Sequence, residues 1–219
     1  MRGRHDHLDQ RGLLLDFGGV LTTSVLDAIR RFCSECGLAP NTLLDAFRSD
    51  PVARQLLIDV ERGAITQGEF EVGVGQLLGV DHHRLVERML ASCEPEPAVL
   101  EAAERARAAG VRTGVLSNSL GLHPYNPYEP WRLKERFDVV VISEETGTRK
   151  PEPAAYRLVL DRLGVAPDQA VFVDDQPANA AGAGAAGMAP VWFDVTRPDD
   201  SYQQVRQAIG LGGATGGSP

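Results

Sequence analysis

The pattern of apolar and polar residues predicts a buried strand near the start of the chain. Residues 13–15 are three consecutive leucines, which stop at Asp16 and are followed by the glycine pair Gly18-Gly19. A short apolar run that ends at turn residues is typical of a strand buried in a parallel sheet. In open α/β sheets, ligands bind beyond the carboxyl ends of the strands. Asp16 is therefore a candidate functional residue, and the two glycines allow the backbone to approach a bound group closely.

The segment after this turn has the signals of helices and lacks the alternation of strands. Ser24 can cap a first helix that ends at Gly37. Pro51 suits the first position of a third helix, and Thr66 opens a capping box for a fourth. The predicted helices cover residues 24–37, 41–49, 51–62, 66–79 and 82–92. We interpret this stretch, residues 23–94, as an all-helical insert.

After the stiff link at residues 95–97, helices and strands alternate along the chain. Strands are predicted at residues 111–116, 139–142, 170–173 and 190–193, and helices at 98–109, 154–163, 178–186 and around 202–209. The glycine-rich tail that follows is expected to be disordered. This alternation predicts an α/β fold with a doubly wound, Rossmann-like parallel sheet. The sheet domain would consist of residues 1–22 and 95–219, with the helical insert as its cap.

Composition and charge narrow the range of partners. The chain has 219 residues, enough for one full core and a small accessory domain. Its formal net charge of −8 argues against nucleic acid or an anionic membrane as the main partner. No apolar segment approaches the roughly 20 residues of a membrane span, and residues 1–12 lack the apolar region of a secretory signal. We therefore expect a cytoplasmic protein.

The three cysteines agree with this expectation. Cys33 and Cys36 form a C-x-x-C pattern, but within a predicted helix and without a preceding strand. Free thiols in a reducing compartment account for them. The alternative is a zinc site that combines these two residues with Cys93, His82 or His83.

Polar side chains follow the predicted strands at their carboxyl ends. They are Asp16, the pair Ser117 and Asn118, a loop that contains Lys150, and the pair Asp174 and Asp175. Three carboxylates beside one ammonium group can hold a hard cation such as Mg²⁺, which shares its coordination shell with a phosphate. Without a cation, mutual repulsion would raise the pKa of one carboxyl group. Ser117 and Asn118 offer uncharged donors to the same phosphate oxygens.

Two of these motifs also have a purely structural interpretation. The segment 147–153 could be a solvated basic turn, although two prolines stiffen the backbone after Lys150 and limit the movement of the lysine. The dipole of the following helix could favour one of Asp174 and Asp175. Two buried acids at one strand end, however, need a cation.

In their order along the chain, these residues resemble the four motifs of the haloacid dehalogenase (HAD) superfamily. The matching segments are residues 15–20 (LDFGGV), 116–118 (LSN), 150–153 (KPEP) and 173–175 (VDD), the last with Asn179 and Gly187-Met188. The helical insert is similar to the C1-type cap of that superfamily. Within it, the closest resemblance is to small-molecule phosphatases, including the N-terminal phosphatase domain of soluble epoxide hydrolases.

The resemblance implies a Mg²⁺-dependent phosphatase that acts by nucleophilic catalysis. Asp16 would attack phosphorus and form an aspartyl-phosphate, which water then hydrolyses. The resemblance implies that Mg²⁺ is held by Asp16, the backbone carbonyl of Gly18, and Asp175, with Asp174 close by.

The remaining motif residues would bind the substrate. Lys150 would neutralise charge between Asp16 and the phosphate, and Ser117 with the Asn118 region would bind the phosphate oxygens. The implied partner is a small-molecule phosphate, with no nucleic acid and no membrane, and the chain is expected to be a monomer or a homodimer. The cap helices carry no recognisable binding pattern, so the sequence predicts no particular substrate.

The chain departs from the family at Gly18, where most HAD phosphatases have a second aspartate that protonates the leaving oxygen. General acid catalysis of this kind contributes about 10²- to 10⁴-fold. A leaving group that needs little protonation, an acid from the cap or substrate, or a slow or lost hydrolase would each explain the glycine.

Three other functions compete with a phosphatase. A haloacid dehalogenase also lacks the second aspartate, but it needs no metal and would leave Asp174-Asp175 unexplained. A phosphonoacetaldehyde hydrolase needs a cap lysine, whereas the chain's two lysines, Lys134 and Lys150, lie outside the insert. An interaction module that kept the fold and lost turnover has only Gly18 in its favour.

One further segment has an open interpretation. The loop 121–131 follows Ser117 closely and is rich in proline and tyrosine. It is either a stiff surface loop or a wall of the substrate pocket formed by its tyrosines and His123.

Overall fold

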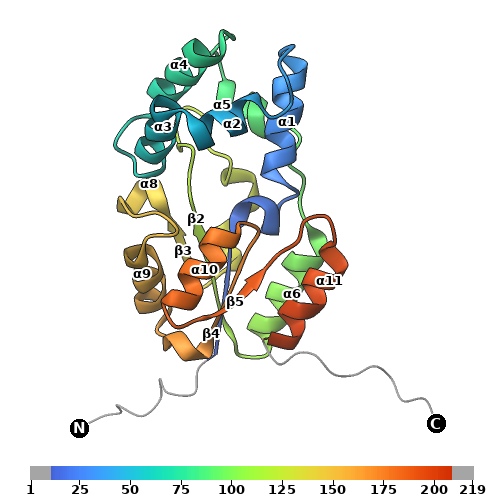
Figure 1. Cartoon of the computed structure of the whole chain (residues 1–219). Coiled ribbons are helices and arrows are strands. Elements are labelled where there is room, and N and C mark those ends of the chain that lie inside the picture. Colours follow the sequence, from blue (N-terminus) through green and yellow to red (C-terminus); the bar gives the residue numbers. More distant parts are fainter. Residues whose placement is uncertain (1–10, 209–219) are drawn as a thin grey trace, which may run out of the picture.

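The computed structural model describes residues 11–208, and its centre is a five-stranded parallel sheet (Figure 1). The strands are β1 (Gly12–Leu15), β2 (Arg112–Ser117), β3 (Val139–Ile142), β4 (Ala170–Asp174) and β5 (Ala189–Trp192). They lie in the order β3-β2-β1-β4-β5, and every neighbouring pair is parallel. The first strand is thus central, with β2 on one side and β4 on the other. The predicted α/β fold is confirmed.

Helices cover both faces of this sheet. They are α6 (Pro97–Ala108), α7 (Leu133–Arg136), α8 (Ser143–Thr146), α9 (Pro153–Leu163), α10 (Pro177–Ala185) and α11 (Pro198–Ala208). Because side chains alternate along a strand, Leu13 and Leu15 of β1 pack on the face covered by α6 and α11. Leu14 packs on the opposite face, against residues of α9 and α10. The sheet is therefore doubly wound, as predicted.

The insert consists of helices. These are α1 (Val25–Glu35), α2 (Thr42–Ser49), α3 (Pro51–Glu61), α4 (Gln67–Leu78) and α5 (Leu85–Leu90). Ser24 caps α1 by accepting a hydrogen bond from the backbone N–H of Asp27, and Thr66 and Glu69 form the predicted capping box of α4. The five helices share an apolar cluster of their own, which includes Phe32 and Phe70.

The chain leaves the sheet domain and returns to it at one place. Thr22 and Pro95 form an antiparallel bridge, the Thr23 N–H donates to the Glu94 carbonyl, and the Glu96 N–H donates to the carbonyl of residue 21. The helices α1–α5 lie above one end of the sheet, the end that the turn after β1 also faces (Figure 1). We propose that residues 23–94 are a cap domain on a core formed by residues 1–22 and 95–219.

Some predicted boundaries differ from the structure. Helix α5 is shorter than the predicted 82–92, because the Asp81 side chain accepts a hydrogen bond from the His83 N–H and Arg84 adopts a left-handed backbone (φ 49°). Helix α11 begins at Pro198, four residues before the prediction. The sequence pattern does not predict α7, α8 or the short helical turns η1 (Phe17–Leu21), η2 (Glu129–Trp131) and η3 (Pro167–Gln169).

The tail expected to be disordered lies outside the described residues. In the part of the chain that the structure describes, no helix is long and apolar enough to cross a membrane.

Candidate active site

Two carboxylates and one ammonium group meet in the interior of the molecule, at the ends of neighbouring strands. Lys150 Nζ lies 2.6 Å from Asp16 Oδ1 and 2.7 Å from Asp174 Oδ2. All three side chains are buried, and Lys150 is only 1% exposed. Asp16 follows β1, Asp174 ends β4, and Lys150 lies in the loop between α8 and α9. The structure thus joins three of the predicted site residues in one buried ion-paired group.

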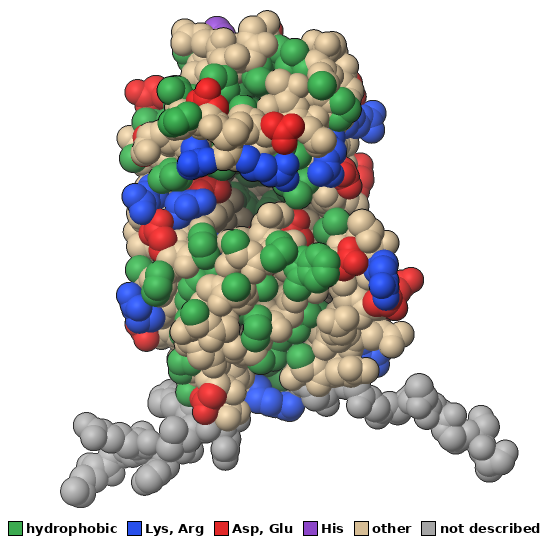
Figure 2. Space-filling model, in the orientation of Figure 1, with side chains coloured by type: hydrophobic (Ala, Val, Ile, Leu, Met, Phe, Trp, Pro, Cys, Tyr) green, Lys and Arg blue, Asp and Glu red, His purple; other side chains and the backbone are tan. Residues whose placement is uncertain are grey.

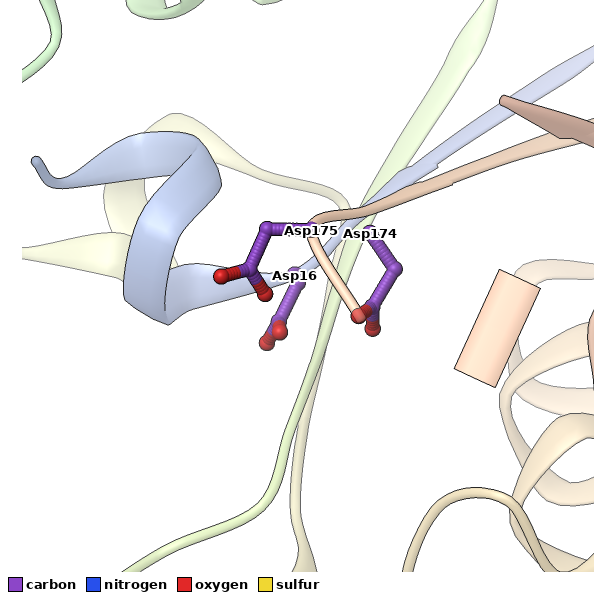
Figure 3. Close-up of side chains that lie close together, drawn as sticks. All are labelled: Asp16, Asp174 and Asp175. Carbon is purple, nitrogen blue, oxygen red and sulfur yellow. The ribbon is translucent and has the colours of Figure 1, made fainter. Parts of the chain in front are cut away.

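The two adjacent aspartates have different surroundings. Asp174 accepts hydrogen bonds from Asn179 Nδ2 (3.1 Å) and from the backbone N–H of Gln176 (2.8 Å). Asp175 is half-buried and accepts a hydrogen bond from the side-chain amide of Gln176 (3.1 Å). Carboxylate oxygens of Asp16, Asp174 and Asp175 lie within 4.8 Å of one another beyond the strand ends (Figure 3). Asp174 is engaged by surrounding donors, so Asp175 and Asp16 are the more available carboxylates.

Burial and charge act against each other in this group. Burial, followed by repulsion from Asp174, raises the pKa of Asp16 well above its ordinary value, although Lys150 opposes the shift. Burial and Asp174 also raise the pKa of Asp175 to about 6. Burial alone would lower the pKa of Lys150, but Asp16 and Asp174 outweigh it and raise that pKa. Three carboxylates against one ammonium group leave an excess of negative charge, which favours a cation.

The turn η1 explains the glycine pair. Gly19 has φ 80°, where glycine is favoured, and a Cβ there would lie 2.5 Å from Asp175 Oδ2. Gly18 has φ −75° and ψ 122°, which any residue can adopt. A Cβ at Gly18 would nevertheless lie 2.8 Å from Cγ2 of Val25, the first residue of α1. The backbone therefore requires glycine at position 19, whereas at position 18 the neighbouring Val25 takes the space of a side chain.

Ser117 and Asn118 follow each other at the end of β2 and contact different partners. Ser117 Oγ lies 3.0 Å from the hydroxyl of Tyr128. Asn118 Nδ2 donates to the Lys150 carbonyl (3.0 Å), and Asn118 Oδ1 accepts from the Lys150 N–H (2.9 Å). The Asn118 side chain therefore holds the Lys150 loop against the end of β2. The phosphate-binding role of Ser117 and Asn118 stays a prediction.

A cavity of about 420 Å³ lies above these residues, between the sheet domain and the helices α1–α5. Its lining contains six predicted site residues: Asp16, Gly18, Ser117, Asn118, Lys150 and Asp175. Asp174 is fully buried, lies outside this lining and pairs with Lys150 Nζ. Figure 2 shows the molecule hollowed at this level, with Lys and Arg side chains along the edge of the hollow. The site is thus open enough for a small molecule.

The loop 121–131 contributes to the cavity, although only with part of the predicted residues. Tyr125, Tyr128 and Trp131 line the cavity, and Tyr128 packs its ring against Phe17 at 4.7 Å. Burial raises the pKa of the Tyr128 hydroxyl to about 12, so it is protonated at neutral pH. His123 is exposed and lies outside the lining, so the wall role predicted for it is wrong.

Residues 10–187 match the family of haloacid dehalogenase-like hydrolases. The chain belongs to this family. The match covers the helical insert and the sheet domain of this HAD-like hydrolase up to residue 187, before β5.

Several curated relatives are similar to part of this HAD-like chain. It is 33% identical to mouse acyl-CoA dehydrogenase family member 10 over 52% of its own length and 10% of the relative. It is 36% identical to the phosphoserine phosphatase of Thermus thermophilus over 43% of the chain and 39% of that protein. It is 29% identical to the phosphoglycolate phosphatase of Rhodospirillum rubrum over 81% and 77% of the two chains. The chain thus spans less than half of the first two relatives.

Solved structures share the fold. A HAD family enzyme from Bacteroides thetaiotaomicron, in complex with magnesium and inorganic phosphate, has a TM-score of 0.64 at 22% identity, over 85% of this chain and 95% of that one. A dehalogenase has a TM-score of 0.61 at 22% identity, over 84% and 85% of the two chains. At this identity, the likeness establishes the HAD fold.

Sequence reasoning misses one ion pair of the HAD-like site. Glu61, the last residue of α3, is buried and paired with Arg149, and both line the cavity. Burial raises the pKa of Glu61, and the charge of Arg149 opposes the shift. Next to it, Arg62 pairs with Glu152 at 2.7 Å. The available signal was a basic residue beside Lys150, but nothing in the sequence pairs it with the end of α3.

The alternative zinc site is not formed. The three cysteines are free thiols. Among residues 11–208, the group placed to share a metal ion is the aspartate cluster, and it contains no cysteine or histidine.

Proposed function

We propose that this HAD-like hydrolase is a Mg²⁺-dependent phosphatase that cleaves a small-molecule phosphate monoester through an aspartyl-phosphate. The observation that supports this proposal most directly is the position of Lys150 Nζ, which lies between Asp16 and Asp174 on the floor of the cavity. Phosphoryl transfer needs positioning and charge stabilisation above all, and this group supplies both. The names of the relatives, phosphoserine and phosphoglycolate phosphatase, support the same reaction class.

The donor set fits Mg²⁺. Carboxylate oxygens at one strand end, with excess negative charge, match a hard cation that prefers oxygen ligands. Asp16, Asp175 and the backbone carbonyl of Gly18 would hold the ion, while Asp174 holds Lys150. When bound, Mg²⁺ would neutralise charge on the phosphate oxygens and keep the carboxylates ionised.

The chain's own residues then account for both halves of the reaction. A carboxylate oxygen of Asp16 attacks phosphorus, and the bond from phosphorus to the leaving oxygen breaks. Water next attacks the phosphorus of the aspartyl-phosphate, which releases inorganic phosphate and restores the Asp16 carboxylate. The Lys150 ammonium offsets the negative charge that builds up between Asp16 and the phosphate, and the Ser117 hydroxyl donates to a phosphate oxygen.

The leaving oxygen lacks the usual proton donor. Gly18 has no side chain, and Val25 fills the adjacent space. The leaving group therefore departs with much of its negative charge, and esters with good leaving groups are favoured. Aryl phosphates, acyl phosphates and sugar 1-phosphates meet this condition, whereas simple primary alkyl phosphates do not.

The proposal includes the type of cap, the location and the oligomeric state. The helices α1–α5 would be a C1-type cap, and the N-terminal phosphatase domain of soluble epoxide hydrolases would be a functional counterpart. The protein would act in the cytoplasm as a monomer or homodimer.

Phosphate release from p-nitrophenyl phosphate, with and without Mg²⁺, tests the proposal. We expect Mg²⁺-dependent release that Asp16→Asn abolishes. A dehalogenase would instead release chloride from 2-chloropropionate without a metal, and an interaction module would release neither product. Either result would contradict the phosphatase.

A further inference from the structure

The two sides of the cavity differ in chemistry. The floor, formed by Asp16, Ser117, Asn118, Lys150 and Asp175, carries charged and polar groups. The opposite wall, which we define by the apolar lining residues, carries no charge apart from the ion pair of Glu61 and Arg149 beside it. Six of the wall residues are Leu26, Ile29, Phe47, Leu57, Leu90 and Leu120. Leu26, Phe47, Leu57, Leu90 and Leu120 are only half-buried, so part of each side chain remains accessible. A ligand held by the floor through its phosphate would therefore place the rest of its structure against apolar side chains.

The described lining offers no unpaired basic group to such a ligand. Besides Lys150, the cavity lining contains one basic residue, Arg149. Arg149 is paired with Glu61, and Lys150 is paired with Asp16 and Asp174. A second anionic group on the substrate would have to displace one of these pairs or remain unpaired next to leucine and phenylalanine. Burial of an unpaired carboxylate is strongly unfavourable.

Among the esters with good leaving groups, we infer that the substrate is one with an apolar leaving group, such as the phosphate monoester of an apolar phenol, and without a second charged group. This inference rests on the proposed phosphatase function for turnover, but it concerns the ligand and can be tested by binding alone. Phosphate esters that carry a carboxylate, such as phosphoglycolate, would be excluded. The basic edge of the hollow would attract the phosphate dianion to the opening.

The cavity volume suits a leaving group of moderate size. About 420 Å³ accommodates a phosphate together with a substituted phenyl ring. Each methylene group that enters an apolar site contributes roughly a fourfold gain in affinity. The gain in kcat/KM as the alkyl substituent of the leaving group becomes longer therefore measures its contact with the wall.

The first experiment compares three esters whose phenolic leaving groups are of similar reactivity. These are phenyl phosphate, 4-butylphenyl phosphate and 4-(2-carboxyethyl)phenyl phosphate, each with Mg²⁺. We expect kcat/KM to increase by roughly fourfold per buried methylene from the phenyl to the butylphenyl ester. The carboxyethyl ester should be at least roughly tenfold poorer than the butylphenyl ester. Equal values for these two esters, or a preference for the carboxylate, would overturn the inference.

A matched pair of variants on α3 tests whether the preference for the butylphenyl ester arises at the apolar wall. Leu57 lines the cavity, whereas Val52 on the same helix is 63% exposed and outside the lining. Leu57→Ser should reduce the preference for the butylphenyl over the phenyl ester at least roughly threefold, and Val52→Ser should leave it unchanged. Equal effects of the two substitutions would contradict a role of this wall.

Binding separates this inference from the phosphatase proposal. The non-hydrolysable 4-butylphenylphosphonate and 4-(2-carboxyethyl)phenylphosphonate can be titrated by calorimetry in the presence of Mg²⁺. Tighter binding of the butyl compound supports the inference even if no ester is hydrolysed, a result that would overturn only the phosphatase. Hydrolysis of phenyl phosphate without any preference for the butyl compound would overturn only the inference.

Discussion

The floor and the wall of the cavity are built in different ways. On the floor, Asp16, Asp174 and Lys150 are fixed by short ion pairs and by strands that are central in the sheet. On the wall, half-buried apolar side chains such as Leu26 and Phe47 come from helices with a separate core. The ion-paired residues of the floor depend on one another, so a substitution there disturbs the whole group. A substitution on the apolar wall changes the contact surface at one side chain only. Under the proposed function, we therefore expect substitutions on the floor to change turnover and substitutions on the wall to change selectivity.

The largest effect is expected on the floor. Asp16→Asn removes the proposed nucleophile, and we expect a loss of turnover of at least about 10³-fold. The substitution is nearly isosteric, and it also removes a charge that Asp174 repels, so the fold should remain. Phosphate release and the melting temperature of the same preparation measure the two properties. Substantial turnover by a verified pure variant would mean that Asp16 is not the nucleophile.

A second prediction concerns the missing acid at the border between floor and wall. In the wild-type protein, kcat/KM should fall steeply as the leaving group becomes more basic. Gly18→Asp would supply the acid, and the φ of −75° accepts a side chain. Because a Cβ would lie 2.8 Å from Val25, the variant is combined with Val25→Ala. This double variant should improve alkyl phosphates by about 10²-fold and aryl phosphates far less.

The matched control carries Gly18→Asn with Val25→Ala, which has the same shape but donates no acidic proton. We would measure kcat/KM for a graded series of phosphate esters with the wild-type protein and both double variants. The comparison separates the effect of the acidic proton from the effect of the changed shape at positions 18 and 25. A flat wild-type series would show that a donor exists elsewhere. Tyr128, whose hydroxyl lies 3.0 Å from Ser117 Oγ and whose pKa is raised by burial, would then be the first residue to replace.

The floor could be predicted from the sequence because each of its residues has a local signal. Asp16 and Asp174 follow apolar runs, and parallel strands bring their ends to one edge of the sheet. Lys150 is marked by the prolines that follow it. Capping residues such as Ser24 and Thr66 likewise made α1 and α4 predictable. Helix α5, which has no side-chain cap, is shorter than predicted.

The rest depends on how the elements dock. Glu61 and Arg149 are 88 residues apart, and Asn118 bonds to a backbone 32 residues away. No local pattern encodes such pairs. The space taken by Val25 beside Gly18 is likewise set by the angle at which α1 leaves the turn, so the sequence indicated a missing acid but not its neighbour.

The third prediction uses the charge of the floor. Mg²⁺ at 100 times its dissociation constant should stabilise the protein by about 2.7 kcal/mol, and EDTA should remove this effect. Asp175→Asn should abolish the stabilisation by Mg²⁺. If EDTA changes neither the melting temperature nor activity, the metal site is wrong.

The same aspartate cluster makes the stability of the protein depend on pH. Burial and Asp174 raise the pKa of Asp175 from 3.8 to about 6. In EDTA, the folded state therefore binds more protons than the unfolded state between these values, and this contribution to stability falls as pH rises through the window. Since Mg²⁺ binds the ionised carboxylates, its stabilising effect should increase over the same range. Melting curves at pH 5 and 7, with Mg²⁺ or EDTA, check both signs.

The last prediction concerns the ion pairs between the end of α3 and the loop around Lys150, which affect stability. The end of α3 forms two ion pairs with the loop around Lys150, and they differ in burial. In the pair of Glu61 and Arg149, the side chains are 10% and 20% exposed. In the pair of Arg62 and Glu152, they are 46% and 30% exposed. Loss of one charge from a buried pair leaves its partner uncompensated, whereas an exposed partner is solvated.

Glu61→Gln keeps the shape of the side chain and removes only its charge, so Arg149 remains partly buried without a counter-charge. We expect a loss of about 2–4 kcal/mol in the free energy of unfolding, because Arg149 retains some contact with water. Arg62→Gln on the adjacent residue should cost less than about 1 kcal/mol. Urea unfolding of both variants measures the difference. Equal losses would show that burial does not distinguish the two pairs.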